Sequence, residues 1–258
     1  MITAASNSRI KRLVQLNQKS KLRRTEDVFL AEGVKMFLEA PREQLQEVYV
    51  SESFLEKCSC REHLEEVGYE VVSDIVFSKI SDTCTPQGVL CVLKQFHYNI
   101  EEMLRDKAPL FLLLENIQDP GNLGTMLRTG EGAGVSGIIM SRDTVDLYNP
   151  KVIRSTMGSI YRVPFYYADD FAAAVHQVQQ AGVSVYAAHL RGKNSYACQD
   201  YTKGTAFLIG NEGNGLREET AELADCYIRI PMEGKVESLN AAVASSILMY
   251  EAHRQRAI

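Results

Sequence analysis

The chain has 258 residues, of which 45% are hydrophobic and 24% charged, and its formal net charge is −5. These values are ordinary for a globular protein of one or two domains and argue against a protein that coats DNA by overall positive charge. No apolar run approaches the roughly 18 residues of a membrane span, and the N-terminus lacks a signal-peptide core, so a cytoplasmic location is expected. The six cysteines never form C-x-x-C and the five histidines never form H-x-x-x-H. Reduced thiols and no metal site are therefore expected.

The first 24 residues form a basic segment with seven lysines and arginines and no acidic residue. A local basic stripe can bind nucleic-acid phosphates although the whole molecule is acidic. The candidates for such contacts are Lys11, Arg12, Arg23 and Arg24. The alternative is a solvated helix face without a partner.

The first hundred residues are typical of a small α/β unit. Apolar residues recur at helical spacing in 8–17, and a strand followed by a helix is predicted in 28–40. Residues 53–68 read as one helix that ends at Gly68, and 99–109 as a linker closed by Pro109. Further strands are predicted over 46–53, 69–73 and 88–96.

From Leu110 the pattern changes to short apolar strands alternating with helices. Strands are predicted over 110–115, 136–141, 183–190, 205–210 and 226–231, and helices begin near Asn122, Asn149, Asp170, Arg217 and Asn240. This alternation favours an α/β fold with a parallel sheet covered on both faces. The predicted domains are residues 1–105, a small α/β domain, and residues 106–258.

A glycine motif in residues 132–137 matches the dinucleotide-binding pattern G-x-G-x-x-G. That pattern acts between a strand and a following helix, whereas here it follows a helix and precedes a strand. No acidic residue occurs between Leu147 and Ala168, where a ribose-binding carboxylate is expected. A nucleotide-dependent oxidoreductase is therefore disfavoured, and the glycines are interpreted as a helix end and a turn.

Polar residues follow three of the predicted strands. The first segment is 116–130, where Asn122 is expected to cap a helix and Arg128 to point away from its apolar face. The second is the glycine-rich segment 210–216, with one acid, Glu212. The third runs from Ile230 to the helix that starts after Asn240. Ligands bind at the carboxyl ends of strands in open α/β sheets, so these segments predict one site.

The motifs N-x-G-x-x-x-R, N-E-G-x-G-L and I-P-M followed by S-L-N occur in this order between Leu110 and Arg256. They resemble the three motifs of the SpoU/TrmH family of RNA ribose methyltransferases in the SPOUT superfamily. The basic N-terminal part, with its F-L-A-E-G sequence, resembles the RNA-binding substrate domain that many members carry. The resemblance implies a sheet with a C-terminal trefoil knot, a homodimer and S-adenosylmethionine as cofactor.

The resemblance also implies the site residues. The catalytic candidates are Asn122, Arg128, Glu212, Ser238 and Asn240. The cofactor-binding candidates are Ala188, Gly210, Asn211, Ile230 and Leu239. Because a guanidinium keeps its proton above pH ~12, Arg128 is expected to act as an electrostatic clamp rather than as a base.

The implied function is methylation of a ribose 2′-hydroxyl in structured RNA, with rRNA favoured over tRNA. Another interpretation is a non-catalytic RNA-binding assembly factor that keeps the fold without the reaction. The intact set of Asn122, Arg128, Glu212 and Asn240 argues against it, because a binder does not need all four.

Overall fold

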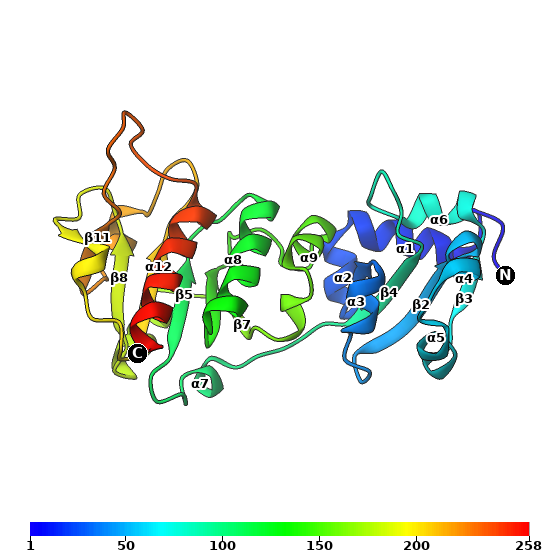
Figure 1. Cartoon of the computed structure of the whole chain (residues 1–258), viewed down its shortest axis with the longest axis horizontal. Coiled ribbons are helices and arrows are strands. Elements are labelled where there is room, and N and C mark those ends of the chain that lie inside the picture. Colours follow the sequence, from blue (N-terminus) through cyan, green and yellow to red (C-terminus); the bar gives the residue numbers. More distant parts are fainter. Residues whose placement is uncertain (258) are drawn as a thin grey trace. The chain divides into compact units, whose positions relative to one another are not determined.

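The computed structural model describes residues 1–257, which form two compact units (Figure 1). The first unit consists of residues 1–96 together with residues 146–161. The second consists of residues 97–145 and the described chain from Arg162 onward. The chain therefore passes from one unit to the other three times.

The first unit contains a four-stranded sheet in the order β1-β4-β2-β3. β4 pairs antiparallel with both of its neighbours, and β2 pairs parallel with β3. Its elements are α1 (Ser8–Gln18), α2 (Ser20–Glu26), β1 (Val28–Glu32), α3 (Val34–Leu38), β2 (Leu45–Ser51), α4 (Glu52–Lys57), α5 (Arg61–Val67), β3 (Glu70–Val72), α6 (Asp74–Ile80), β4 (Val89–Lys94), α9 (Pro150–Thr156) and the short helix η1 (Ser159–Tyr161).

Two sets of apolar contacts stabilise the first unit. Ile10, Leu13 and Leu16 of α1 are buried with residues of α6 in one apolar cluster. The segment 146–161 supplies further packing, since Tyr148 lies with its ring 4.8 Å from that of Phe29. This segment follows β6 in sequence but completes the core of the first unit.

The expected single helix over residues 53–68 is wrong. The chain forms α4 and α5 instead, and Cys58 adopts an extended conformation between them. The sequence patterns also did not predict α2 or α6. The strands of the first unit lie where they were expected.

The second unit contains a seven-stranded sheet in the order β7-β6-β5-β10-β8-β11-β9. Every pairing is parallel, which confirms the predicted α/β class. Its elements are α7 (Ile100–Met103), β5 (Leu110–Leu114), α8 (Pro120–Ala133), β6 (Gly137–Ser141), β7 (Phe165–Ala168), α10 (Phe171–Gln180), β8 (Ser184–Ala188), β9 (Asn194–Ser195), η2 (Tyr196–Cys198), β10 (Thr205–Ile209), α11 (Glu218–Ala221), β11 (Cys226–Arg229) and α12 (Ala241–Arg256).

Helices cover both faces of this sheet. α7 and α10 pack on the face that carries Phe111 and Leu113 of β5. α8 and α12 lie side by side and α12 also contacts β5 and β10 (Figure 1). Successive strand residues point to opposite faces, so an apolar strand such as β5 is buried on both.

The central strands β5 and β10 end at the same level. Leu114 pairs with Ile209, the last residue of β10. Because both strands run in the same direction, the segments that follow them start next to each other. Within residues 1–257, every helix is too short or too polar to cross a membrane.

Candidate functional site

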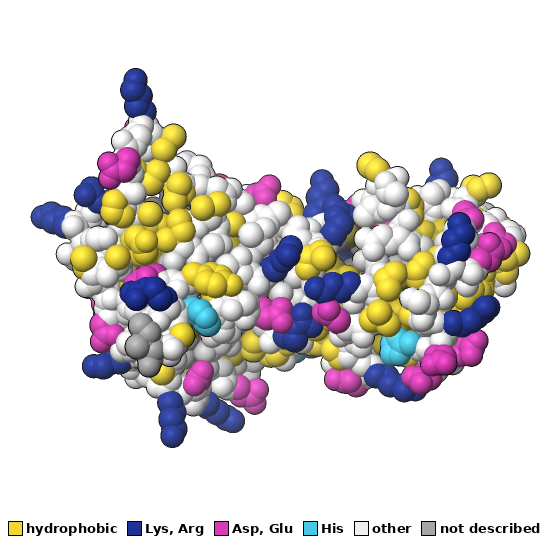
Figure 2. Space-filling model, viewed as in Figure 1, with side chains coloured by type: hydrophobic (Ala, Val, Ile, Leu, Met, Phe, Trp, Pro, Cys, Tyr) yellow, Lys and Arg dark blue, Asp and Glu magenta, His cyan; other side chains and the backbone are white. Residues whose placement is uncertain are grey.

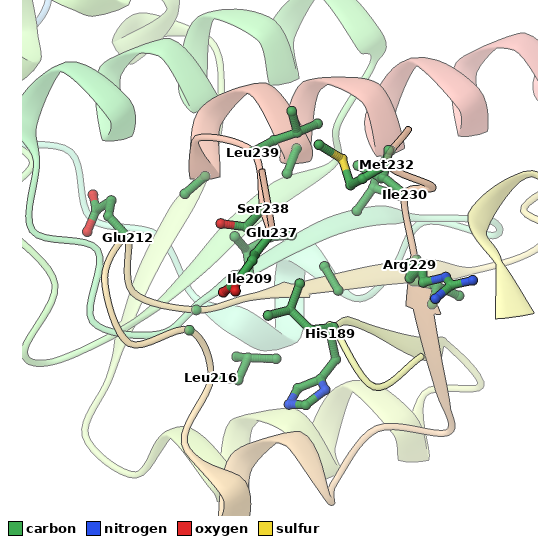
Figure 3. Close-up of a pocket in the computed structure, with 18 of the residues that line it drawn as sticks. His189, Ile209, Glu212, Leu216, Arg229, Ile230, Met232, Glu237, Ser238 and Leu239 are labelled. Atoms are coloured by element: carbon green, nitrogen blue, oxygen red, sulfur yellow. The ribbon is translucent and has the colours of Figure 1, made fainter. Parts of the chain in front are cut away.

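A cavity of about 580 Å³ opens beside the carboxyl ends of β8, β10 and β11, entirely within the second unit (Figure 3). The segment before α12 and the first turns of that helix complete its wall. Its lining includes Ala188, His189, Leu190, Ile209–Leu216, Ile228–Glu233, Glu237–Leu239, Ala241, Ala244 and Leu248. All five residues predicted to bind the cofactor, Ala188, Gly210, Asn211, Ile230 and Leu239, are among them.

The cavity has the size and chemistry of a small-molecule site. Apolar side chains of Ile230, Met232 and Leu239 lie on the side nearest α12, and Leu216 and His189 lie on the opposite side (Figure 3). Backbone groups of the glycine-rich segment and the polar side chains of the wall are also present. An aromatic base between apolar walls, with polar groups toward a ribose and an amino acid, fits this lining.

The segment that follows β10 forms a closed hairpin. Asn211 and Gly215 exchange two backbone hydrogen bonds, of 3.0 and 2.9 Å. A Cβ atom on Gly210 would lie 2.2 Å from the backbone carbon of Gly215, so this position requires glycine. The Asn211 side-chain oxygen accepts hydrogen bonds from the amides of Gly213 and Asn214, and its Nδ2 donates to the carbonyl of Asn116. The backbone of the hairpin is therefore fixed against the end of β5.

Glu212, at the tip of this hairpin, is bound to the start of α8. Its carboxylate accepts hydrogen bonds from the backbone amides of Gln118 at 3.0 Å and Asp119 at 2.9 Å, and from Asn122 Nδ2 at 3.0 Å. Partial burial raises the pKa of Glu212, but the hydrogen bonds from Asn122, Gln118 and Asp119 outweigh it and the net pKa is lowered. Glu212 is therefore an anion at neutral pH.

Asn122 links Glu212 to Asn240. Asn240 Nδ2 donates a 3.0 Å hydrogen bond to Asn122 Oδ1 while the Asn240 Oδ1 caps α12 by accepting from the amides of Ala242 and Val243. The three motifs therefore meet in one chain of hydrogen bonds, Asn240 to Asn122 to Glu212.

The expectation that Asn122 caps α8 is wrong. Asp119 is the N-cap, because its carboxylate accepts from the amide of Asn122 at 2.8 Å and Pro120 occupies the first helical position. The side chain of Asn122 is thus free of a capping role, and both ends of its amide face the other motifs.

The remaining catalytic candidates lie apart from this chain of hydrogen bonds. Ser238 is exposed and lines the cavity. Arg128 is exposed on α8, does not line the cavity, and has no hydrogen bond or ion pair with any described residue. Its guanidinium is consequently available to an external anion.

The sequence analysis did not single out His189, although it lines the cavity directly after Ala188. Its ring lies 5.1 Å from that of Tyr227 and accepts a hydrogen bond from the amide of Arg191. Burial, followed by the charge of Arg191, lowers the pKa of His189, so the ring is neutral at pH 7. His189 was missed because it lies in the mostly apolar segment 183–190, which was interpreted only as a strand.

The basic residues of the first unit differ in their availability. Lys11 and Arg24 are exposed, whereas Arg12 is half-buried and paired with Glu26 at 2.6 Å and Glu47 at 2.7 Å. Arg23 is only 3% exposed; its guanidinium donates to the carbonyl of Leu16 and pairs with Asp146 at 2.5 Å. This burial revises the prediction for Arg23, because a phosphate cannot reach a guanidinium in the core.

The sequence model of the SpoU rRNA Methylase family matches residues 109–250, more than half of the chain. The chain belongs to this family. A second match, to the MRM3-like substrate binding domain, covers residues 7–91. The two matches follow the predicted order of a substrate domain and a SpoU methylase domain.

Several relatives match this chain over nearly its full length. It is 32% identical over 252 residues to the 23S rRNA (guanosine(2553)-2′-O)-methyltransferase RlmP of Bacillus subtilis, covering 96% of this chain and 97% of the relative. The AdoMet-bound rRNA methyltransferase of Sinorhizobium meliloti is 31% identical, with a TM-score of 0.84 over 98% of this chain and 97% of that one. AviRb of Streptomyces viridochromogenes, in complex with the cofactor AdoMet, is 26% identical with a TM-score of 0.88, covering 97% and 98%.

Proposed function

We propose that this chain transfers the methyl group of S-adenosylmethionine to a ribose 2′-hydroxyl in rRNA. The observation that carries the proposal is the hydrogen-bonded chain Asn240–Asn122–Glu212 at the rim of a cavity of cofactor size. Whole-length relatives named as rRNA methyltransferases, one of them AdoMet-bound, support it.

The cofactor is held by the lining of the cavity. Backbone groups at Gly210, Asn211, Ile230 and Leu239 and the wall at Ala188 would bind it, and the sulfonium supplies an already activated methyl group. The residues of the chain therefore need only to align the acceptor hydroxyl and stabilise charge as its proton leaves.

Arg128 is assigned to the RNA side of the reaction. Its guanidinium remains protonated, so it would stabilise the developing alkoxide and a neighbouring phosphate rather than remove a proton. Asn122 and Asn240 would orient the ribose, since amide groups both donate and accept hydrogen bonds. Glu212 fixes Asn122, and Ser238 contributes a hydroxyl at the cavity wall.

The active form is proposed to be a homodimer in the cytoplasm. Val243 and Tyr250 of α12 are 48% and 49% exposed, and hydrophobic side chains are visible over this helix in Figure 2. Arg128 does not line the cavity of its own chain. A second copy docked along α8 and α12 would instead supply its Arg128 to this cavity. Sedimentation velocity at micromolar concentration tests the dimer. The trefoil knot remains a prediction.

The first unit is proposed to bind the RNA. Its match to a substrate-binding domain and the exposed Lys11 and Arg24 support this role. We favour rRNA as the substrate because the relatives that match over nearly the full length are named as rRNA methyltransferases. The experiment has to exclude tRNA as the substrate.

The test is transfer of labelled methyl from S-adenosylmethionine to total RNA, separated into rRNA and tRNA. Label in rRNA that blocks alkaline cleavage next to the modified nucleotide is the expected result. Arg128→Ala should reduce this transfer about 10²-fold or more while the cofactor affinity stays unchanged. Label only in tRNA would overturn the substrate assignment, and cofactor binding without transfer to any RNA would favour an assembly factor.

A further inference from the structure

The hairpin 210–216 carries Glu212 at its tip. At its base it is held by a second set of contacts, made by Glu115, which lies outside the three motifs. Glu115 is the first residue after β5 and is only 1% exposed. Its carboxylate accepts a hydrogen bond from the amide of Arg217 at 2.8 Å and one from the hydroxyl of Thr220. Buried polar oxygen atoms are stable only when they have such hydrogen-bond donors.

Arg217 ends the hairpin segment and connects it with a third strand. Its Nη1 lies 3.5 Å from Glu115, and its Nη2 pairs with Asp143, which follows β6. Ser141, the last residue of β6, donates a 2.5 Å hydrogen bond to Asp143 and accepts one from the amide of Asn116 at 2.8 Å. Arg217 therefore ties together the segments that follow β10, β5 and β6.

Arg217 and Asp143 carry opposite charges. Burial raises the pKa of Asp143, but hydrogen bonds from Ser141 and Arg217 outweigh it and the net pKa is lowered. The hydrogen bond to Asp143 in turn raises the pKa of Arg217. Both groups are ionised at neutral pH, and a fork of guanidinium nitrogens reaching two carboxylates is more directional than a lysine would be.

The hairpin between these attachments is a wall of the cavity. Residues from Gly210 to Leu216 line it, while Arg217 and Glu115 do not. Glu212 fixes the tip of the hairpin to α8, and Glu115 with Arg217 fixes its base. A movement at the base would shift the backbone groups that face the cofactor, although no atom of Arg217 lines the cavity.

We propose that Arg217 and Asp143, acting with Glu115, are positioning residues that set the cofactor-binding conformation of the hairpin 210–216. This inference rests on the proposed function. It assigns to the pair a role in cofactor affinity, distinct from the role of Arg128 and Asn122 on the RNA side. The pair acts through the hairpin, and neither residue lines the cavity.

The experiment compares Arg217→Ala, Asp143→Ala and the double variant with Arg142→Ala. Arg142 is a matched control because it adjoins Asp143 in sequence and is paired with the exposed Asp169, away from the hairpin. Binding of S-adenosylhomocysteine is measured by calorimetry, and KM for S-adenosylmethionine and kcat are measured on the labelled RNA fraction. Each single variant should raise the Kd and KM about 3–10-fold, with a smaller change in kcat.

The double variant should bind the probe about as strongly as Arg217→Ala, because Arg217→Ala already breaks the contact with Asp143. Arg217→Lys, which keeps the charge without the fork, should give an intermediate Kd. Arg142→Ala should bind as the wild type does. A lowered melting temperature with unchanged Kd and KM would overturn the inference and leave Arg217 with a purely structural role. Failure of the wild type to bind the probe would instead overturn the proposed function, and the inference with it.

Discussion

Two groups of polar and charged residues, one in each unit, were expected to be functional, and they differ in how their side chains are bound. In the second unit, residues from three distant motifs meet, since Asn240, Asn122 and Glu212 form one chain of hydrogen bonds. In the first unit, the basic stripe is divided: Arg12 and Arg23 are bound to carboxylates, and Lys11 and Arg24 remain exposed.

The difference shows what each kind of pattern encodes. A polar residue after a buried strand is placed by the topology, because parallel strands deliver their carboxyl ends to one edge. The basic residues of a helix do not by themselves show which of them is paired with an acid. That depends on acids far along the chain, as Asp146 is for Arg23.

The largest effect that would sharpen this comparison is expected from Arg23→Ala. The substitution leaves the partly exposed Asp146 without its cation and the Leu16 carbonyl without its donor, and leaving such groups unsatisfied costs about 1–3 kcal/mol. Urea unfolding should show this loss, while the matched exposed variant Arg24→Ala should change stability by less than about 0.5 kcal/mol. Equal stability of the two variants would contradict the interior role of Arg23.

A pair of substitutions at Asn240 separates its two hydrogen-bonding roles. Asn240→Asp keeps an oxygen that caps α12 but cannot donate to Asn122, so methyl transfer should fall about tenfold at nearly constant melting temperature. Asn240→Ala should lose both activity and about 1 kcal/mol of stability. If Asn240→Asp retains full activity, its hydrogen bond to Asn122 has no role in positioning the ribose.

The attachment made by Glu212 should depend on pH. Because its pKa is lower in the folded protein than in the unfolded chain, its contribution is complete above the usual glutamate range and is lost as pH falls through the folded pKa. Affinity for S-adenosylhomocysteine should therefore decrease in acid in the wild type. Glu212→Gln should bind more weakly at neutral pH and lose most of this acid dependence; an identical pH profile would assign the dependence to another group.

The smallest effect is expected from the exposed part of the basic stripe. Neutralising Lys11 and Arg24 together should weaken RNA binding several-fold at low salt and reduce the salt dependence by roughly the two charges removed. Affinity for S-adenosylhomocysteine and the melting temperature should stay constant. RNA binding that does not change at any salt concentration would identify this stripe as a solvated helix face.

The sequence predicted most of the second unit, because its apolar strands and capping residues are local signals. Helices do begin near Asn149, Asp170 and Asn240, as predicted, and each of these residues is the N-cap. Asn122 is not, since Pro120 starts the helix earlier and Asp119 becomes the cap. Helical periodicity in residues 53–68 also concealed a break at Cys58, where the chain is extended. At the start of α8, two possible caps lie three residues apart, and Pro120 favours Asp119. In residues 53–68, helical spacing continues across a residue that is not helical.

Glu115 could not be recognised as functional from sequence, because a single acid after an apolar strand has no periodic or motif signal. Its meaning depends on Arg217, 102 positions later, and on Thr220. The same holds for residues 146–161, which follow a strand of the second unit but pack in the first. Contacts between distant segments carry this information, and a single sequence does not display them.

The placement of residues 146–161 has a consequence for how the protein is made. During synthesis the first 96 residues emerge well before Asp146 and Tyr148. Until then, Arg23 lacks its ion-pair partner Asp146, and Phe29 lacks its contact with Tyr148. Domains generally fold as units from the N-terminus onward, but this one is complete only when residue 161 has left the ribosome. A fragment that ends at residue 96 should therefore be less stable than the same residues in the whole chain, and the ribosome has to translate β5, α8 and β6 before the first unit can finish folding.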